Sequence, residues 1–181
     1  REQNASILRN EIKGDTLLRI MTEDQVSSHN RVLMHSEKGD LKELMKLIES
    51  GKQAIKWESC RGLNDFTPLH HACNRGHMLV ASAVLKAYPP MLHSMTNADE
   101  SPLHLAVVGN QLLLVEQLLD KGADVDAQTK DGETPLMYAC RKGQPAMVRL
   151  LLARGARVSP QDRYGETAVD YCDDNEGLLR W

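Results

Sequence analysis

Apolar residues recur along this chain in short stretches with helical spacing. The clearest stretches are Val80–Leu85, Leu112–Leu119 and Met147–Leu152, and the last two are followed by Gly122 and Gly155. A shorter and less apolar stretch precedes each of them. This alternation predicts pairs of helices, of which the second is the more apolar.

The shorter stretches begin with a repeated motif. It reads Thr67-Pro68-Leu69-His70, then Ser101-Pro102-Leu103-His104 after 34 residues, then Thr134-Pro135-Leu136-Met137 after a further 33. The hydroxyl residue suits a helix N-cap, and proline suits the first helical position because its missing N–H costs nothing there. Each motif is followed by a small residue (Ala72, Ala106 and Ala139), which favours close helix packing.

The turn inside each pair carries its own signal. Gly76 and Gly143 stand where the first helix should end, at a point where a positive φ is expected. Asn110 holds that place in the middle unit, and Asn tolerates the left-handed region well. The eight to ten residues after each second helix, rich in Asp, Gly, Gln and Lys, predict a projecting loop or hairpin.

These units resemble ankyrin repeats, whose family pattern is a helix–loop–helix of about 33 residues with a T-P-L-H start. The resemblance is specific over residues 64–159. It implies an all-α fold: an ankyrin-repeat solenoid of helix–loop–helix units with projecting β-hairpin-like loops. The expected domain covers residues 30–181, divided into 30–63, 64–97, 98–130, 131–163 and a partial capping repeat at 164–181.

The first of these repeats is divergent, because it lacks the T-P-L-H start. The stretch from Gly39 to Gly51 fits the second half of a unit, and the first helix is expected over Arg31–Lys38. Residues 1–29 form an extension whose apolar positions, such as Ile12 and Leu17, could share one side of one or two helices. A solenoid needs its end faces covered, which favours a helical cap; a linker or a partner-binding segment is the alternative.

Composition and charge exclude several functions. The chain has 22 Lys+Arg against 25 Asp+Glu, a net charge of −3 that disfavours direct binding of nucleic acid. Its apolar runs are far shorter than the ~20 residues of a membrane-spanning helix, so no membrane insertion is expected. The four cysteines form no CxxC and predict reduced intracellular thiols. The chain begins with Arg1, which suggests a piece of a longer protein.

No catalytic or metal-binding motif stands out. The sequence contains no P-loop, G-x-G-x-x-G, H-E-x-x-H or G-x-S-x-G. His70-His71-x-Cys73 is the nearest approach to a metal cluster, but it lacks a second ligand pair, and His70 and Cys73 occupy ordinary repeat positions. We therefore expect no enzyme activity, cofactor or metal.

The resemblance implies a non-catalytic protein–protein interaction module within a larger intracellular scaffold or adaptor. Such a module would bind another protein or a linear peptide on its concave face and would be monomeric in isolation, in the cytoplasm or nucleus. The alternative is a regulatory ankyrin segment of a larger enzyme or channel.

Residues at matched places in successive repeats line up, and this selects a candidate surface. The loops should present Phe66 and a row of glutamates, and the short helices should present basic flanks, an apolar middle and one tyrosine. The candidate partner-binding residues are Phe66, His71, Asn74, Arg75, Glu100, Leu105, Val108, Glu133, Tyr138, Arg141 and Lys142. A further irregular and apolar loop, Tyr88–Met95, either packs on neighbouring second helices or makes a contact particular to this chain.

Overall fold

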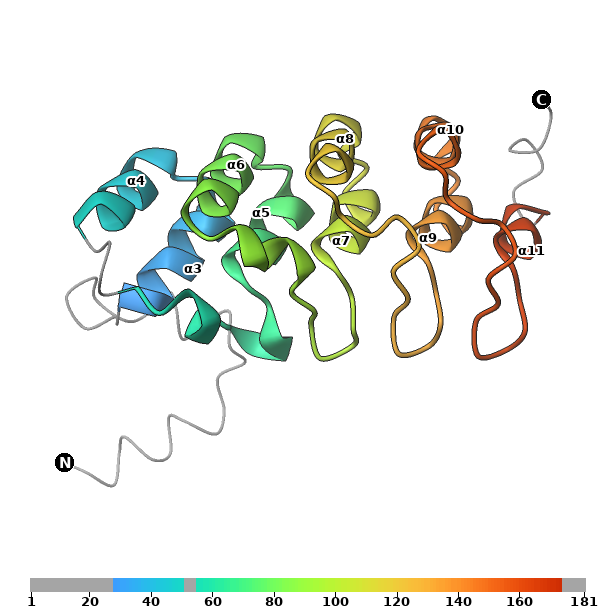
Figure 1. The fold of residues 1–181 in the computed structure, drawn as a ribbon, viewed down its shortest axis with the longest axis horizontal. Coiled ribbons are helices and arrows are strands. Elements are labelled where there is room, and N and C mark those ends of the chain that lie inside the picture. Colours follow the sequence, from blue (N-terminus) through green and yellow to red (C-terminus); the bar gives the residue numbers. More distant parts are fainter. Residues whose placement is uncertain (1–27, 51–54, 174–181) are drawn as a thin grey trace, which may run out of the picture.

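Two rows of helices run along the molecule, and loops project from one side (Figure 1). The computed structural model describes residues 28–50 and 55–173. The inner row comprises α3 (Ser28–Lys38), α5 (Pro68–Arg75), α7 (Pro102–Val108), α9 (Pro135–Arg141) and α11 (Ala168–Asp173). The outer row comprises α4 (Leu41–Ser50), α6 (Met78–Ala87), α8 (Leu112–Asp120) and α10 (Pro145–Ala153). The described residues contain no β-strand, which confirms the all-α solenoid.

In the described part of the chain, three short 3₁₀ helices lie in the connections between these helices: η2 (Trp57–Ser59), η3 (Leu63–Asp65) and η4 (Pro89–His93). The last falls in the irregular loop. Met91 and Leu92 are buried there, 2% and 6% exposed, and belong to the core. The packing interpretation of this loop is therefore confirmed for these two residues.

The predicted helix starts are confirmed. The side chains of Thr67, Ser101 and Thr134 each accept a hydrogen bond from the backbone N–H three residues later. A proline occupies the first turn of α5, α7 and α9. The hydroxyl side chain thus satisfies one of the free N–H groups at the start of each inner helix.

The predicted turn conformations are confirmed as well. Gly76, Gly143 and Asn110 have φ of 75°, 63° and 54°. There is also little space beside Gly76, because a Cβ there would lie 2.5 Å from the side chain of Gln111 in the next repeat. The positive φ therefore favours glycine at this turn, and a Cβ there would also make the end of the Gln111 side chain shift.

The inner helices stack on one another through small residues. Ala72, Ala106 and Ala139 are each 0% exposed, and α5, α7, α9 and α11 form successive contacts. The predicted close packing at these positions is confirmed. This packing forms one continuous core between the two rows, and it sets the spacing between the side chains of successive inner helices.

The projecting loops are joined to one another by backbone hydrogen bonds. Lys130 N–H donates to Ala98 O at 3.0 Å, and Arg163 N–H donates to Asp131 O at 2.8 Å. The loop before α5 joins the array in the same way, through the 2.9 Å bond from Asn97 N–H to Asn64 O. The loops therefore form a continuous edge rather than independent flaps.

The first repeat contains the helix expected there. The described helix α3 (Ser28–Lys38) covers the whole Arg31–Lys38 stretch predicted as its first helix. Most of the predicted cap over residues 1–29 lies outside the described residues, and the division of the chain into domains and repeats stays a prediction.

Candidate interaction surface

Buried histidines hold the loops against the inner helices. His70 Nδ1 accepts a hydrogen bond from Thr67 N–H at 3.1 Å, so the other ring nitrogen carries the proton. That nitrogen, Nε2, lies 3.1 Å from the backbone oxygen of Glu100, in the next loop. Each side of the ring therefore has a partner, and together they tie one repeat to the next.

The same arrangement recurs one repeat later. His104 Nδ1 accepts from Ser101 N–H at 3.2 Å, and Nε2 lies 3.2 Å from Glu133 O. Burial lowers the pKa of His70 to about 3 and that of His104 to about 4, because the charged ring would lose its hydration. In the third motif Met137 takes this place, and Thr134 N–H lies 3.3 Å from its sulfur.

The loops bound by His70 and His104 carry Glu100 and Glu133, and both glutamates contact the inner helix α9. Tyr138 Oη donates to Glu100 Oε1 at 3.2 Å, and Arg141 pairs with Glu133. The Arg141 guanidinium lies 4.7 Å from the centre of the Tyr138 ring and 5.7 Å from that of Tyr171. These five residues form one connected cluster, which we call the Arg141 cluster.

Electrostatics favour this arrangement. Burial raises the pKa of Tyr138, and the carboxylates of Glu100 and Glu133 raise it further, so the phenol stays protonated and able to donate. Burial alone would lower the pKa of Arg141, but its pairing with Glu133 outweighs this and raises the pKa. The side chain of Arg141 is 42% exposed, so it is positioned by the protein and still accessible.

The structure corrects the exposure expected of two candidates. Leu105 is only 4% exposed and belongs to the core, so it is not presented to a partner. Tyr138, at 8% exposed, is buried rather than a free anchor. Val108 is half-buried and packs against the same core.

The remaining candidates lie in different settings. Phe66 is half-buried, with its ring centre 5.7 Å and 5.4 Å from those of His70 and His71. Arg75 is exposed and donates to Glu37 Oε1 at 3.0 Å. Asn74 and Lys142 are exposed on or beside the inner helices. The structure thus brings Glu100, Glu133, Tyr138 and Arg141 into one connected set of contacts. Arg75 pairs instead with Glu37, in the first repeat.

Two participants were not selected from the sequence. Tyr171 faces Arg141 and donates to Asp162 Oδ2 at 2.7 Å. Asp162 also accepts from the backbone N–H of Glu166 at 2.9 Å, as Thr129 Oγ1 does from Glu133 N–H one repeat earlier. The spacing of 33 residues between Thr129 and Asp162 was the signal that could have found this loop-closing role.

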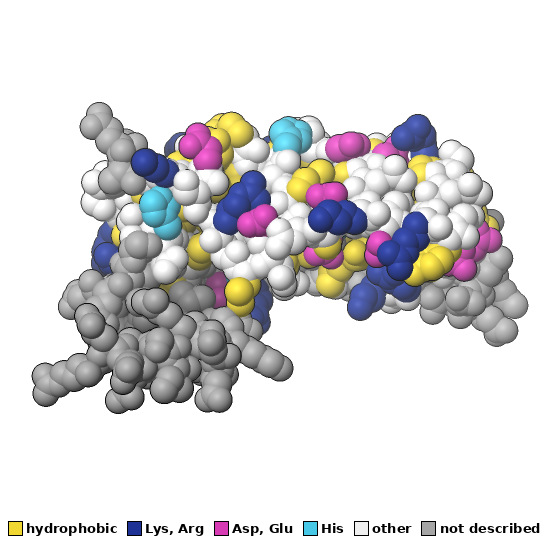
Figure 2. Space-filling view, turned by 90° about the horizontal axis from the view of Figure 1, so that it is seen from below, with side chains coloured by type: hydrophobic (Ala, Val, Ile, Leu, Met, Phe, Trp, Pro, Cys, Tyr) yellow, Lys and Arg dark blue, Asp and Glu magenta, His cyan; other side chains and the backbone are white. Residues whose placement is uncertain are grey.

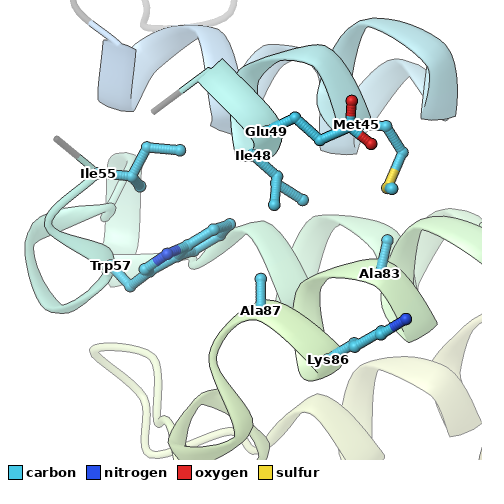
Figure 3. A pocket seen from close by; sticks show the side chains of 8 residues that line it. All are labelled: Met45, Ile48, Glu49, Ile55, Trp57, Ala83, Lys86 and Ala87. Carbon is cyan, nitrogen blue, oxygen red and sulfur yellow. The ribbon is translucent and has the colours of Figure 1, made fainter. Parts of the chain in front are cut away.

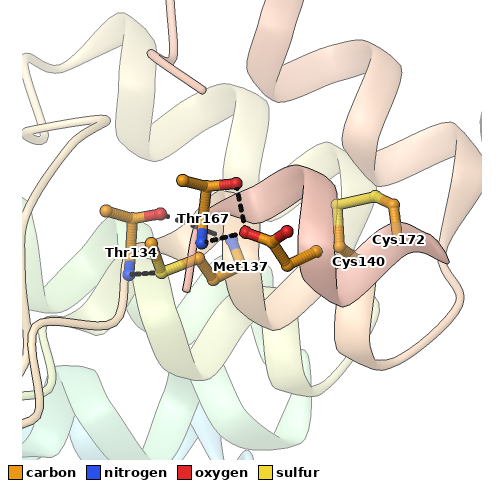
Figure 4. Close-up of a disulfide and its surroundings, with 6 residues drawn as sticks. Thr134, Met137, Cys140, Thr167 and Cys172 are labelled. Carbon is orange, nitrogen blue, oxygen red and sulfur yellow. Dashed lines mark hydrogen bonds between the residues drawn. A yellow bond between two sulfur atoms is a disulfide. The ribbon is translucent and has the colours of Figure 1, made fainter. Parts of the chain in front are cut away.

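The expectation of four reduced thiols is wrong for one pair. Cys140 and Cys172 form a disulfide that joins α9 to α11, with Cα atoms 4.7 Å apart (Figure 4). They are 32 residues apart in sequence, close to one repeat period, so stacking places them side by side. Cys60 and Cys73 are free and buried, and burial raises the pKa of the Cys60 thiol to about 11.

The charges on the loop side are mixed. Figure 2 shows Lys and Arg side chains next to Asp and Glu side chains along the array, rather than one broad basic field. Within residues 28–50 and 55–173, no helix is both long and apolar enough to cross a membrane. The same residues contain no group of three His, Cys, Asp or Glu placed to hold a metal ion.

Comparison with known proteins adds the family. The model for ankyrin repeats (3 copies) matches residues 32–129 and 103–178. The chain belongs to the ankyrin-repeat family. Ankyrin repeats are protein–protein interaction modules and are generally non-catalytic.

Three curated relatives are similar over part of their length. NF-kappa-B inhibitor alpha of Mus musculus is 39% identical over 74 residues, which cover 36% of this chain and 24% of that protein. Ankyrin repeat domain-containing protein 53 of Macaca fascicularis is 35% identical over 71 residues, covering 37% and 14%. Ankyrin repeat and SOCS box protein 2 of Rattus norvegicus is 29% identical over 106 residues, covering 59% and 16%. The match thus spans less than a quarter of each relative.

Proposed function

We propose that this chain is the partner-binding part of a larger intracellular scaffold or adaptor, and that it grips another protein or a linear peptide on its concave face. The surface extends over the inner helices and loops from Phe66 to Lys142. It acts by binding alone, without catalysis.

The Arg141 cluster is the observation that carries this proposal. Arginine is among the residues most often found at the energetic centre of interfaces. Here its side chain is held by Glu133 and by two aromatic rings, so little conformational entropy remains to be lost on binding. It is nevertheless 42% exposed, which leaves guanidinium N–H groups available to a partner carboxylate or carbonyl.

The burial of two candidate residues changes the kind of partner that the surface would suit. Because Leu105 and Tyr138 are buried, the accessible groups are mostly polar: Asn74, Arg75, Arg141 and Lys142. A partner with acidic and amide groups along an extended stretch, and at least one apolar residue to meet Phe66 and Val108, would complement it.

The test is a comparison of matched arginine variants. A partner is first captured with the wild-type chain as bait, and its affinity is then measured for Arg141→Ala and for the control Arg157→Ala. Arg157 is also exposed and paired, with Asp126 at 2.8 Å, but it follows the outer helix α10. We expect Arg141→Ala to weaken binding at least tenfold and the control to stay within twofold. If Arg141→Ala keeps wild-type affinity while folding normally, the surface lies elsewhere.

A further inference from the structure

A second surface lies on the outer helices, away from the Arg141 cluster. A groove of about 530 Å³ opens between α4 and α6, above the segment that carries Ile55 and Trp57 (Figure 3). It is lined by Met45, Ile48, Glu49, Ile55, Trp57, Ala83, Lys86 and Ala87. Its volume falls within the ~300–1,000 Å³ typical of ligand-binding pockets.

Small residues on one wall and a fixed aromatic ring on the other form this groove. Ala83 and Ala87 present only methyl groups from α6, toward Ile48 of α4 and the Trp57 ring (Figure 3). The Trp57 ring is stacked on Tyr88, with ring centres 6.4 Å apart and planes 6° from parallel. Tyr88 in turn donates to Glu58 at 3.4 Å. The aromatic wall of the groove is therefore held in place by contacts within the protein.

The rim carries two charges of opposite sign. Glu49 on α4 and Lys86 on α6 are both exposed. Glu49 and Lys86 form no ion pair or side-chain hydrogen bond with another residue in 28–50 or 55–173. An apolar floor between one acid and one base favours an amphipathic occupant whose flanks carry the opposite charges.

We propose that this groove docks an amphipathic α-helix of a partner protein. Apolar side chains at positions i, i+3 or i+4, and i+7 enter the groove, a basic residue meets Glu49, and an acidic residue meets Lys86. Trp57 supplies the kind of large anchoring surface common at interfaces, and Met45, 38% exposed, can adapt its shape to the helix. This docking is independent of the function proposed for the concave face.

A second copy of this chain does not suit the groove in the same way. Two copies related by a twofold axis would place one concave apolar surface against another, and neither would fill the other. A protruding helix ridge fills it directly. The segment 1–27 of this chain is the other occupant that the experiment separates.

The test is selection from a display library of helical peptides, made on the whole chain and counter-selected on Ala83→Glu, which fills the groove with a charge. Recovered peptides should bind the wild type at least tenfold more tightly than Ala83→Glu. The control Leu113→Glu, at a 69% exposed site on α8, should stay within twofold. If Ala83→Glu does not fold, Ala87→Lys replaces it. Trp57 emission in a Trp181→Phe background should shift to the blue on binding.

Charge reversal is the decisive part of this test. Lys86→Glu should weaken the selected peptides at least fivefold, and changing their acidic residue to Lys should restore the loss. The proposal is overturned if no recovered peptide distinguishes wild type from Ala83→Glu, or if the reversal restores nothing. It is also overturned if deletion of residues 1–27 raises peptide affinity more than tenfold and a synthetic peptide of residues 1–27 competes, because the occupant is then this chain's own segment.

Discussion

Two fully buried histidines of the T-P-L-H motifs, His70 and His104, should make the stability of this protein depend on pH in a calculable way. His70 and His104 are each 0% exposed, and burial lowers their pKa from 6.5 to about 3 and about 4. In the unfolded chain both rings regain a pKa near 6.5. Between these values the unfolded state binds more protons than the folded state, so stability is full above pH 6.5 and falls as the pH is lowered.

The magnitude follows from the width of that window. At pH 5 an unfolded histidine lies about 1.5 pH units below its pKa, while the folded ring is still neutral. At about 1.4 kcal/mol per unit, each histidine contributes about 2 kcal/mol of lost stability, or about 4 kcal/mol for the pair. This is a large share of the ~5–15 kcal/mol that stabilises a typical domain.

A double variant isolates this contribution. In His70→Gln with His104→Gln, the amide can still accept the N-cap hydrogen bond and donate to the loop carbonyl, but it does not titrate. Urea unfolding at pH 7.5 and pH 5 should show a loss about 4 kcal/mol smaller in the double variant than in the wild type. His93→Gln, at an exposed site on η4, is the control and should leave the wild-type loss unchanged. If wild type and double variant differ by less than about 1 kcal/mol, the buried neutral rings are not the cause.

Other predictions test the packing. Ala139→Asp places a carboxylate at a 0% exposed helix contact and should cost well above ~3 kcal/mol in urea melts; a cost under about 1 kcal/mol would contradict the packing. Reducing the Cys140–Cys172 disulfide, which closes a loop across a separation of 32 residues, should lower stability by about 3 kcal/mol, while Cys172→Ser should be insensitive to reductant. Gly76→Ala should cost more than Gly122→Ala. Both have positive φ, but only at Gly76 would the new Cβ meet a neighbour within 4 Å. Equal costs would show that Gln111 moves aside freely.

The repeat made the fold predictable from the sequence. Caps, prolines and glycines act within one unit, so Thr67 with Pro68 and the turn at Gly76 could be assigned without knowing any neighbour. The divergent first repeat offered less to work from, because it lacks the T-P-L-H motif. A helix can therefore be placed from the sequence where its own cap, proline and turn residues are present.

The surface was harder to predict because it depends on contacts between units. Position within a repeat suggested that Leu105 and Tyr138 face a partner, yet the neighbouring inner helices bury both. The same stacking pairs Cys140 with Cys172, 32 residues away, and Tyr138 with Glu100, 38 residues away. Since residues about one period apart become neighbours, such contacts can be sought by comparing positions i and i+33 before a structure is known. That comparison would have placed Asp162 with Thr129 as a loop-closing residue, and it would have tested each candidate anchor for a partner in the next repeat.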